Sequence, residues 1–506
     1  MKNYKRYKQR YLLLITIAII SICVTSAILF FQDDLFQTEI ISPRKLSIKG
    51  TVHCSRSSTH CPNIILIMTD DQGWGQTGYY NHPVLKTPNL DTMAANGLRF
   101  DRFYAGAPVC SPTRASILTG RSNDRTGVPD HGFALRLEEI TLPSVLKAFG
   151  YSTGHFGKWH LNGLRGPGVP VLGDDKYSPG AFGFDEWLSV TNYFDMNPIM
   201  SRKGVFEELE GDTSKIIVDE AIRFISASIK NGNPFFAVIW DAAPHKPWKA
   251  SQTDKISFGM LDADSQNHYG ELVAFDRSVG VLRNSLRDLG IENNTLVWFF
   301  SDNGGLNGIT PGTVAGLRGF KGSLWEGGIR VPAIIEWPAV IKPRTTNYPA
   351  STMDVFATIT DILNLPATAS LEPIDGISLY PLFAHDIGKR DYPIFFRYRG
   401  MGALIDNEYK LITTDISKDE YMLFDISVDQ IESSDISSEN AITFERMKSM
   451  YKTWNTTVED SIAGKDYPEG IVYKSRPKPH LWTNDERYKL FIKEWRMRPE
   501  YNEWIQ

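Results

Sequence analysis

The chain has 506 residues, of which 42% are hydrophobic and 22% are charged. This is the composition of a globular protein with material for a large core, so we expect one large domain plus a smaller one, or a single elaborated α/β domain. The formal net charge of −5 is small and argues against general affinity for nucleic acid.

The N-terminal segment predicts export. Residues 1–10 carry five basic side chains and no acidic one, and residues 11–31 are uncharged and about long enough to span a bilayer. Because the basic residues hold their end in the cytoplasm, we expect the rest to be periplasmic, exposed at the cell surface or secreted. Residues 1–31 are therefore a signal peptide or a membrane anchor, and a polar linker over 32–62 follows them.

The four cysteines divide by position. Cys23 lies in the targeting segment, whereas Cys54 and Cys61 lie close together in the exported region. Their spacing predicts a local disulfide, and a metal clip with the adjacent histidines is the alternative, although no familiar zinc pattern has this spacing. Cys110 is left without a partner, which is unusual for an exported chain.

Three short apolar runs share one pattern and are each closed by polar residues and glycine. They are residues 63–68, 235–240 and 295–300. The pattern favours buried parallel strands, although periodicity alone does not exclude buried helices. Helix-like segments alternate with them, at 87–98, 141–150 and 265–290. The alternation predicts a three-layer α/β fold whose ligands bind where the strands end.

The pattern changes after about residue 385. Short runs of strand character, separated by turn residues, follow one another between residues 391 and 427. We expect a small antiparallel subdomain with a closing helix near 440–454, followed by a basic, aromatic-rich tail that wraps the body of the protein. The C-terminal subdomain and tail therefore take residues 386–506.

Two of the predicted strands are followed directly by hard oxygen ligands. Asp70 and Asp71 come after the first strand, and Asp302 and Asn303 come after another. If these strand ends meet at one edge, three carboxylates and an amide oxygen converge, and such a cluster needs a cation to remain charged. Oxygen ligands suit calcium or magnesium better than zinc. The alternative is that these residues only cap helices or form turns.

Cys110 is predicted to lie at the start of a helix. Ser111 is a candidate cap, Pro112 fits the first turn, and Gly120 is placed to end the helix. The positive end of the helix dipole favours anions, and Arg114 in the first turn adds a forked set of donors. The stretch therefore predicts an anion site beside Cys110.

The stretch "CSPTRASILTGR" resembles the signature of the type I, formylglycine-dependent sulfatases of the alkaline-phosphatase superfamily, and in particular the arylsulfatases and N-acetylgalactosamine sulfatases. Other motifs follow in family order over roughly residues 63 to 383, among them "NIILIMTDDQGWG", "GYSTGHFGKWHLNG", "APHKPW", "SDNGG" and "LRGFKGSLWEGGIRVP". The resemblance implies an alkaline-phosphatase-like three-layer sandwich with a large mixed sheet, with residues 63–385 as the sulfatase catalytic domain. Thr113 and Asn162 replace a common serine and a common glycine, and neither change removes a group needed for chemistry.

The resemblance also implies roles for individual residues. The implied calcium ligands are Asp70, Asp71, Asp302, Asn303 and Cys110, the last after its conversion to formylglycine (3-oxoalanine). The implied catalytic residues are Cys110, Arg114, Lys158, His160, His245 and Lys321. Arg114 and Lys158 would fix the formylglycine hydrate, and His160 would be the base that acts on its second hydroxyl. His245, the general acid, and Lys321 would contact the sulfate and the leaving oxygen.

The implied activity is hydrolysis of sulfate esters through a formylglycine hydrate nucleophile and a sulfoenzyme intermediate. A sulfated carbohydrate such as ulvan, carrageenan or a glycosaminoglycan is the expected substrate, and a formylglycine-generating or anaerobic sulfatase-maturating enzyme is the expected partner. A phosphate or phosphonate ester hydrolase of the same superfamily is the alternative enzyme. A non-catalytic protein that binds sulfated glycans is the alternative from another class.

The segment 162–214 is predicted to be a loop-rich insert that sets specificity. Its candidate contacts for sugar hydroxyls or anions are Arg165, Lys176, Tyr193, Asp195 and Arg202. The alternative for most of them is an ordinary position in a surface loop.

Overall fold

The computed structural model describes residues 61–192, 194–473, 476–498 and 501. The predicted targeting segment, most of the linker and Cys54 lie outside these residues. Cys61 is disulfide-bonded. No helix within the described ranges is long and apolar enough to cross a bilayer.

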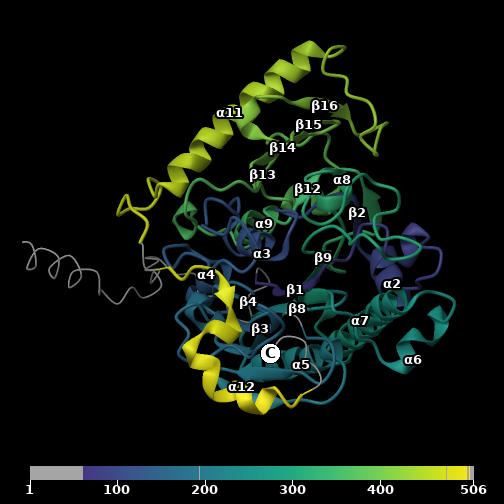
Figure 1. Ribbon diagram of the computed structural model, residues 1–506, viewed down its shortest axis with the longest axis vertical. Coiled ribbons are helices and arrows are strands. Elements are labelled where there is room, and N and C mark those ends of the chain that lie inside the picture. Colours follow the sequence, from purple (N-terminus) through teal and green to yellow (C-terminus); the bar gives the residue numbers. More distant parts are fainter. Residues whose placement is uncertain (1–60, 193, 474–475, 499–500, 502–506) are drawn as a thin grey trace, which may run out of the picture. The chain divides into compact units, whose positions relative to one another are not determined.

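The core is one eleven-stranded mixed sheet (Figure 1). Its centre is parallel, because β1 pairs with β8 and β9, and β3 pairs with β8 and β5, all in the same direction. β10 runs antiparallel between β9 and β2. In spatial order the strands are β11 (Arg344–Thr346), β2 (Leu98–Tyr104), β10 (Arg330–Glu336), β9 (Thr295–Ser301), β1 (Asn63–Thr69), β8 (Phe235–Trp240), β3 (Ser152–Lys158), β5 (Glu186–Val190), β6 (Ile199–Arg202) and β7 (Val205–Glu208), with β12 (Ala350–Ser351) beside β2.

Helices cover both faces of this sheet, which confirms the predicted three-layer α/β fold (Figure 1). One face packs against α2 (Pro88–Asn96), α5 (Thr213–Lys230) and α7 (Ala263–Asp288). The other carries α3 (Cys110–Thr119), α4 (Leu142–Ala148) and α9 (Asp354–Ile362). The central strands are buried on both sides, which explains why they are continuous apolar runs. Three short helices are α6 (Gln252–Lys255), α8 (Glu326–Ile329) and α10 (Tyr380–Ala384).

A second, antiparallel sheet follows in the C-terminal part of the chain. Its strands are β13 (Ile394–Tyr398), β14 (Met401–Asp406), β15 (Tyr409–Thr413) and β16 (Met422–Asp425). The closing helix, α11 (Ala441–Ile462), lays Met447, Tyr451 and Trp454 on this sheet. It extends beyond the predicted end near residue 454, because Val458 continues the same buried stripe.

The tail returns to the segment 162–214. β17 (His480–Leu481) pairs in parallel with β4 (Leu164–Arg165), and α12 (Lys489–Trp495) follows. Trp482 is fully buried in an aromatic cluster with Tyr488, Trp495 and Tyr501. The segment 162–214 itself is less loop-rich than predicted, since β5, β6 and β7 extend the large sheet through it.

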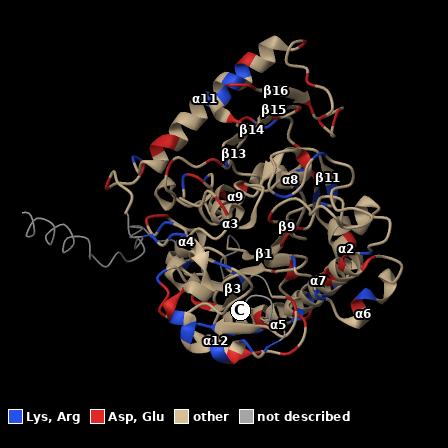
Figure 2. Ribbon diagram, viewed as in Figure 1, with Lys and Arg blue, Asp and Glu red and all other residues tan. Residues whose placement is uncertain are grey.

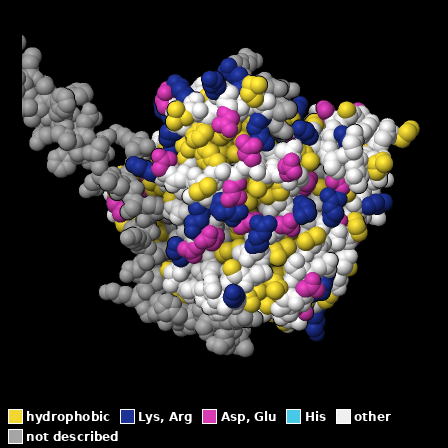
Figure 3. Space-filling model, turned by 90° about the horizontal axis from the view of Figure 1, so that it is seen from below, with side chains coloured by type: hydrophobic (Ala, Val, Ile, Leu, Met, Phe, Trp, Pro, Cys, Tyr) yellow, Lys and Arg dark blue, Asp and Glu magenta, His cyan; other side chains and the backbone are white. Residues whose placement is uncertain are grey.

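Basic and acidic side chains are mixed over the surface. Figure 2 shows both signs along α11 and α12. On the face seen in Figure 3, Lys and Arg side chains lie next to Asp and Glu side chains, with apolar side chains scattered between them. That face therefore carries no single-sign field, and attraction for an anion has to arise from a local site.

Candidate active site

The acidic ligands gather where β1 and β9 end. The two strands pair in parallel with Thr69 opposite Ser301, so the residues after them leave the sheet at the same edge. Oxygens of Asp70, Asp71 and Asp302 all lie within 4.8 Å of one another, and all three side chains are buried. The backbone N–H of Asp71 donates to Asp302 Oδ1 at 3.2 Å. Asp71 has a φ of 69°, a left-handed conformation that aspartate adopts more readily than most residues.

Three cationic side chains contact this acidic cluster. Nη2 of Arg114 donates to Asp70 at 2.9 Å and to Asp302 at 3.0 Å. Lys158 Nζ lies 2.5 Å from Asp70, and Lys321 Nζ lies 2.5 Å from Asp71. Three carboxylates and three basic groups balance one another, so a bound divalent cation would leave the site with an excess positive charge for an anionic substrate.

The cationic neighbours control the protonation of the acids. Burial opposes the charge of Asp70, but Lys158, His245, Arg114 and Lys321 together lower its pKa below the ordinary range. Burial and the neighbouring Asp70 raise the pKa of Asp302. Asp70 is therefore held more firmly in its charged form than Asp302.

Cys110 faces the same cluster from the start of α3. The helix begins at Cys110, with Val109 as its N-cap, so the prediction that Ser111 caps the helix is wrong. Ser111 Oγ instead accepts a hydrogen bond from the N–H of Gly132 at 2.8 Å. Gly120 ends the helix in a left-handed conformation, as predicted. Cys110 is a buried free thiol, and its Sγ, an Asp70 oxygen and a ring nitrogen of His245 lie within 4.8 Å of one another.

Two histidines complete the set, and they differ in exposure. His160 follows β3 with a φ of 56°, is buried, and has no hydrogen-bond partner on either ring nitrogen among the described residues. Burial, Lys158 and Arg114 hold its pKa well below the usual value of 6.5, so the ring is neutral. His245 follows β8, and its side chain is 16% exposed. Its Nε2 lies 3.8 Å from Asp71, and its Nδ1 lies 2.5 Å from the carbonyl oxygen of Lys246.

The acidic cluster fits a hard cation. Asp70 Oδ1 and Asn303 Oδ1 are buried without a hydrogen-bond partner in the described part of the chain, so each has a lone pair to offer. Together with Asp71 and Asp302 they form an all-oxygen donor set of the kind that calcium and magnesium prefer. The second grouping, of Asp70, Cys110 and His245, is mixed and softer, but only as long as Cys110 keeps its sulfur.

Comparison with known proteins decides the family. A family model described as "Sulfatase" matches residues 62–365. The chain is 34% identical over 394 residues to the N-acetylgalactosamine-6-sulfatase of Canis lupus familiaris. The aligned region covers 69% of this chain and 71% of the relative. The chain belongs to the sulfatase family. It is therefore a sulfuric ester hydrolase, and members of this family use a formylglycine and a metal ion.

Other relatives of this sulfatase differ in their substrates. It is 32% identical over 387 residues to human Arylsulfatase A, covering 69% of this chain and 74% of that protein. It is 31% identical over 339 residues to an ulvan-active sulfatase of Formosa agariphila, covering 62% of this chain and 64% of that protein.

Solved structures share its fold. The crystal structure of Ps i-CgsB superposes with a TM-score of 0.69 at 24% identity, covering 82% of this chain and 95% of that one. The phosphonate monoester hydrolase of Agrobacterium radiobacter superposes with a TM-score of 0.55 at 17% identity, over 79% and 96% of the two chains. This confirms the alkaline-phosphatase-like architecture, and it also shows that the fold serves more than one ester class.

The residues predicted as substrate contacts in the segment 162–214 differ in their surroundings. Burial and the neighbouring carboxylates of Asp212, Asp241 and Asp70 raise the pKa of Asp195 well above its ordinary value. Arg165 donates to the carbonyl oxygen of His131 at 3.1 Å and 3.0 Å. Arg202 is instead paired with Glu207 and Glu220, and Lys176 is exposed. Tyr193 lies outside the described residues.

Sequence reasoning missed two contributors to the site. The guanidinium of Arg114 lies 5.0 Å from the centre of the Trp240 ring, at the end of β8. The loop at residues 130–132 also contacts the start of α3, where Gly132 N–H donates to Ser111 Oγ, although no motif marks it. The Trp240 contact had a local signal, because the residue ends a predicted strand, whereas the position of the loop depends entirely on tertiary contacts.

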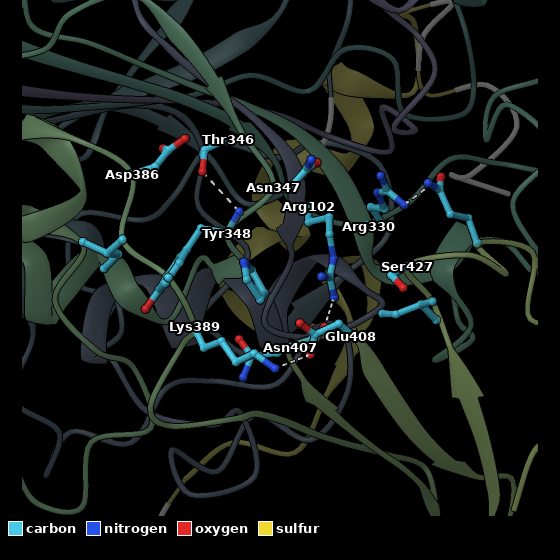
Figure 4. Close-up of a pocket in the computed structure, with 15 residues that line it drawn as sticks. Arg102, Arg330, Thr346, Asn347, Tyr348, Asp386, Lys389, Asn407, Glu408 and Ser427 are labelled. Carbon is cyan, nitrogen blue, oxygen red and sulfur yellow. Dashed lines mark hydrogen bonds and ion pairs between the residues drawn. The ribbon is translucent and has the colours of Figure 1, made fainter. Parts of the chain in front are cut away.

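A separate pocket of about 400 Å³ lies between the edge of the large sheet and the turn that joins β14 to β15 (Figure 4). Arg102, Arg330, Tyr348, Lys389 and Asn407 are among its lining residues. None of the predicted site residues lines it, so it is distinct from the catalytic cluster.

Proposed function

We propose that the protein releases sulfate from a sulfated carbohydrate, with Cys110 converted to formylglycine and calcium as the metal. The observation that carries this proposal is the position of Cys110 at the start of α3, within 4.8 Å of Asp70 and His245 and beside three basic side chains. A nucleophile there meets the sulfur of an ester whose oxygens lie among positive groups.

The donor set supports calcium. Asp70, Asp71, Asp302 and Asn303 would hold the ion, and a bound cation would polarise the sulfate oxygens and offset their charge. Hydrated formylglycine at position 110 supplies two hydroxyls on one carbon, so that one attacks sulfur and the other permits release of sulfate by C–O cleavage.

The protein side chains would divide the remaining work. His245 Nδ1 carries a hydrogen, because it faces a carbonyl oxygen, which only accepts. Its Nε2 lies on the Asp71 side, where a protonated ring can deliver a proton to the sugar oxygen as the S–O bond breaks. His160 is neutral and buried, as a base that later takes a proton needs to be. Lys321 and Arg114 hold the sulfate oxygens.

The relatives support a saccharide as the leaving group. Their printed names include N-acetylgalactosamine-6-sulfatase and ulvan-active sulfatase, and one solved structure of the same fold is a complex with a neocarrahexaose. A sulfated oligosaccharide or polysaccharide is therefore the proposed substrate class.

Export and maturation complete the proposal. The basic residues before the uncharged stretch 11–31 support export to the periplasm, cell surface or medium, with that stretch as signal peptide or anchor. A formylglycine-generating or anaerobic sulfatase-maturating enzyme would act on Cys110 before folding, because the thiol is buried in the folded protein. Fractionation of producing cells tests the location, and full retention in the cytosol would contradict it.

The decisive experiment combines mass spectrometry with turnover. In protein made together with a maturating enzyme, we expect the Cys110 peptide to be lighter, because the CH2–SH side chain becomes an aldehyde in which oxygen replaces sulfur and two hydrogens are lost. We also expect sulfate release to exceed phosphate release from matched 4-nitrophenyl esters. Cys110→Ala should reduce turnover to background without loss of fold, and calcium should raise the melting temperature of the matured protein.

Faster cleavage of the phosphate ester would instead favour a phosphate or phosphonate hydrolase. Retention of sulfated glycan with no turnover would favour a binding protein.

A further inference from the structure

The loop at residues 130–132 lies against the catalytic helix. Gly132, which follows His131, donates its backbone N–H to the Oγ of Ser111 at 2.8 Å. Ser111 in turn follows Cys110 directly in the helix. His131 therefore lies next to the start of α3, although neither the family motifs nor the predicted ligand set includes it.

The ring of His131 is held in one orientation. Its Nδ1 lies 2.9 Å from Asp130 Oδ1, and the same oxygen accepts the backbone N–H of His131 at 2.8 Å. A carboxylate oxygen only accepts, so Nδ1 carries the hydrogen, and Nε2 is the ring nitrogen that can offer a lone pair. Arg165 donates to the carbonyl oxygen of His131 and fixes the backbone as well.

The C-terminal sheet supplies the other half of this arrangement. Tyr398 O–H donates to Asp130 Oδ1 at 3.1 Å, and Arg399 donates to Asp130 Oδ2 at 2.9 Å and 2.5 Å. Tyr398 pairs with Met401, so Arg399 and Gly400 form the two-residue turn between β13 and β14.

The turn is locally unfavourable for an arginine. Arg399 has a φ of 47° and Gly400 a φ of 80°, and hairpin turns with two positive φ values favour asparagine or glycine at the first position. Strained residues of this kind cluster at functional sites, where the surrounding structure holds them. Here the strained position carries the guanidinium that orients Asp130.

His131 is nevertheless open on its outer side. Its side chain is 42% exposed, and Nε2 has no partner among the residues that the structure describes. An exposed ring edge that is held next to the start of α3 can contact a group that approaches Cys110 from solvent.

We propose that His131 is a specificity-determining residue that accepts a hydrogen bond from a hydroxyl of the sugar bearing the sulfate. Asp130 and Arg399 are its positioning residues. This inference rests on the proposed function, because it assigns the contact to the saccharide part of the substrate and assigns no role in S–O bond cleavage.

The test compares two sulfate esters that differ only in the leaving group. One is 4-nitrophenyl sulfate, which has no sugar hydroxyl. The other is the saccharide that the wild type cleaves fastest among N-acetylgalactosamine 6-sulfate, an ulvan oligosaccharide and a neocarrahexaose. For His131→Ala we expect kcat/KM on the saccharide, relative to the aryl ester, to fall about 10- to 100-fold, as loss of a polar contact of about 1.5–3 kcal/mol requires.

Three further variants separate positioning from folding. His131→Gln, whose amide oxygen can accept, should recover part of the saccharide activity. Arg399→Asn suits the turn and should keep the melting temperature within about 2 °C of wild type, while the saccharide-to-aryl ratio still falls. His385→Ala removes an exposed histidine elsewhere and should leave both activities unchanged.

Equal losses on both esters, or no loss on the saccharide, would overturn the proposal. Wild-type turnover of 4-nitrophenyl sulfate is scored separately, so failure of the sulfatase assignment and failure of the His131 assignment give different results.

Discussion

The two candidate catalytic histidines differ in solvent exposure and in the charged groups beside them. His160 is buried among Lys158 and Arg114, both of which disfavour an imidazolium, and its pKa falls well below 6.5. His245 is partly exposed, and its Nε2 lies 3.8 Å from Asp71. The buried, neutral ring of His160 is suited to accept a proton, as the proposed base of a two-step ester hydrolysis has to.

The lowered pKa of His160 predicts how activity changes as the pH becomes acidic. A base is active only when neutral, and a lowered pKa means that His160 stays neutral until the pH falls below the ordinary histidine range. We expect kcat for 4-nitrophenyl sulfate, which includes the step that this base assists, to hold as the pH falls to about 6.5 and to decline only below it. His160→Ala should reduce the rate of sulfate release in single-turnover measurements. A decline centred above pH 7 in the wild type would contradict the assignment of His160 as this base.

At the scale of elements, the buried central strands could be predicted from the sequence, whereas the start of α3, the edge strands and the loops around the site could not. β1, β8 and β9 are buried on both faces, so each is a continuous apolar run that the sequence displays directly. The start of α3 was misplaced because no side chain caps it, and β5 to β7 were missed because they are short and contain polar residues. The candidate metal ligands could be named from the sequence because they directly follow strands, whereas Asp130 and His131 follow none.

Gly157 shows how closely the strands around the site approach each other. It precedes Lys158 on β3 and has a φ of 109°, and a Cβ at this position would lie 2.0 Å from the carbonyl oxygen of Trp240. That oxygen belongs to the backbone of β8 and has little room to move. The glycine thus lets Lys158 and Trp240 take part in one site.

Gly157→Ala should therefore disturb both the fold and the site. We expect a loss of about 2–4 kcal/mol in the free energy of unfolding, from strain at a left-handed position and from overpacking, measured by urea titration. Turnover should fall as Lys158 moves away from Asp70. Gly259→Ala is the matched control, because its nearest contact lies 3.7 Å from the added Cβ. A Gly157→Ala protein with wild-type stability would contradict this expectation, because it would show that the backbone of β8 moves to make room for the added Cβ.

At the scale of the whole molecule, buried ion pairs join the C-terminal sheet to the catalytic part. Lys410 on β15 lies 3.0 Å from Glu326 and 2.8 Å from Glu432, and all three side chains are fully buried. Glu326 opens α8, five residues after Lys321. The turn at Arg399 reaches Asp130 from the same sheet. The strands of this sheet were predictable from local pattern, but pairs between residues 84 positions apart leave no local pattern to find.

Lys410→Met tests whether this connection supports the catalytic segment. The variant removes one charge and leaves two glutamates buried without a cation, so we expect a loss of about 3–5 kcal/mol in the free energy of unfolding. The triple variant Lys410→Met, Glu326→Gln, Glu432→Gln removes all three charges and should recover part of that loss, because neutral amides cost less to bury. Denaturant titration gives both values.

If the network also orders the segment that carries Lys321, Lys410→Met should lower kcat for 4-nitrophenyl sulfate under conditions where the protein is fully folded. A stability loss without any change in kcat would show instead that the C-terminal sheet serves the fold and contributes to the site only through Tyr398 and Arg399.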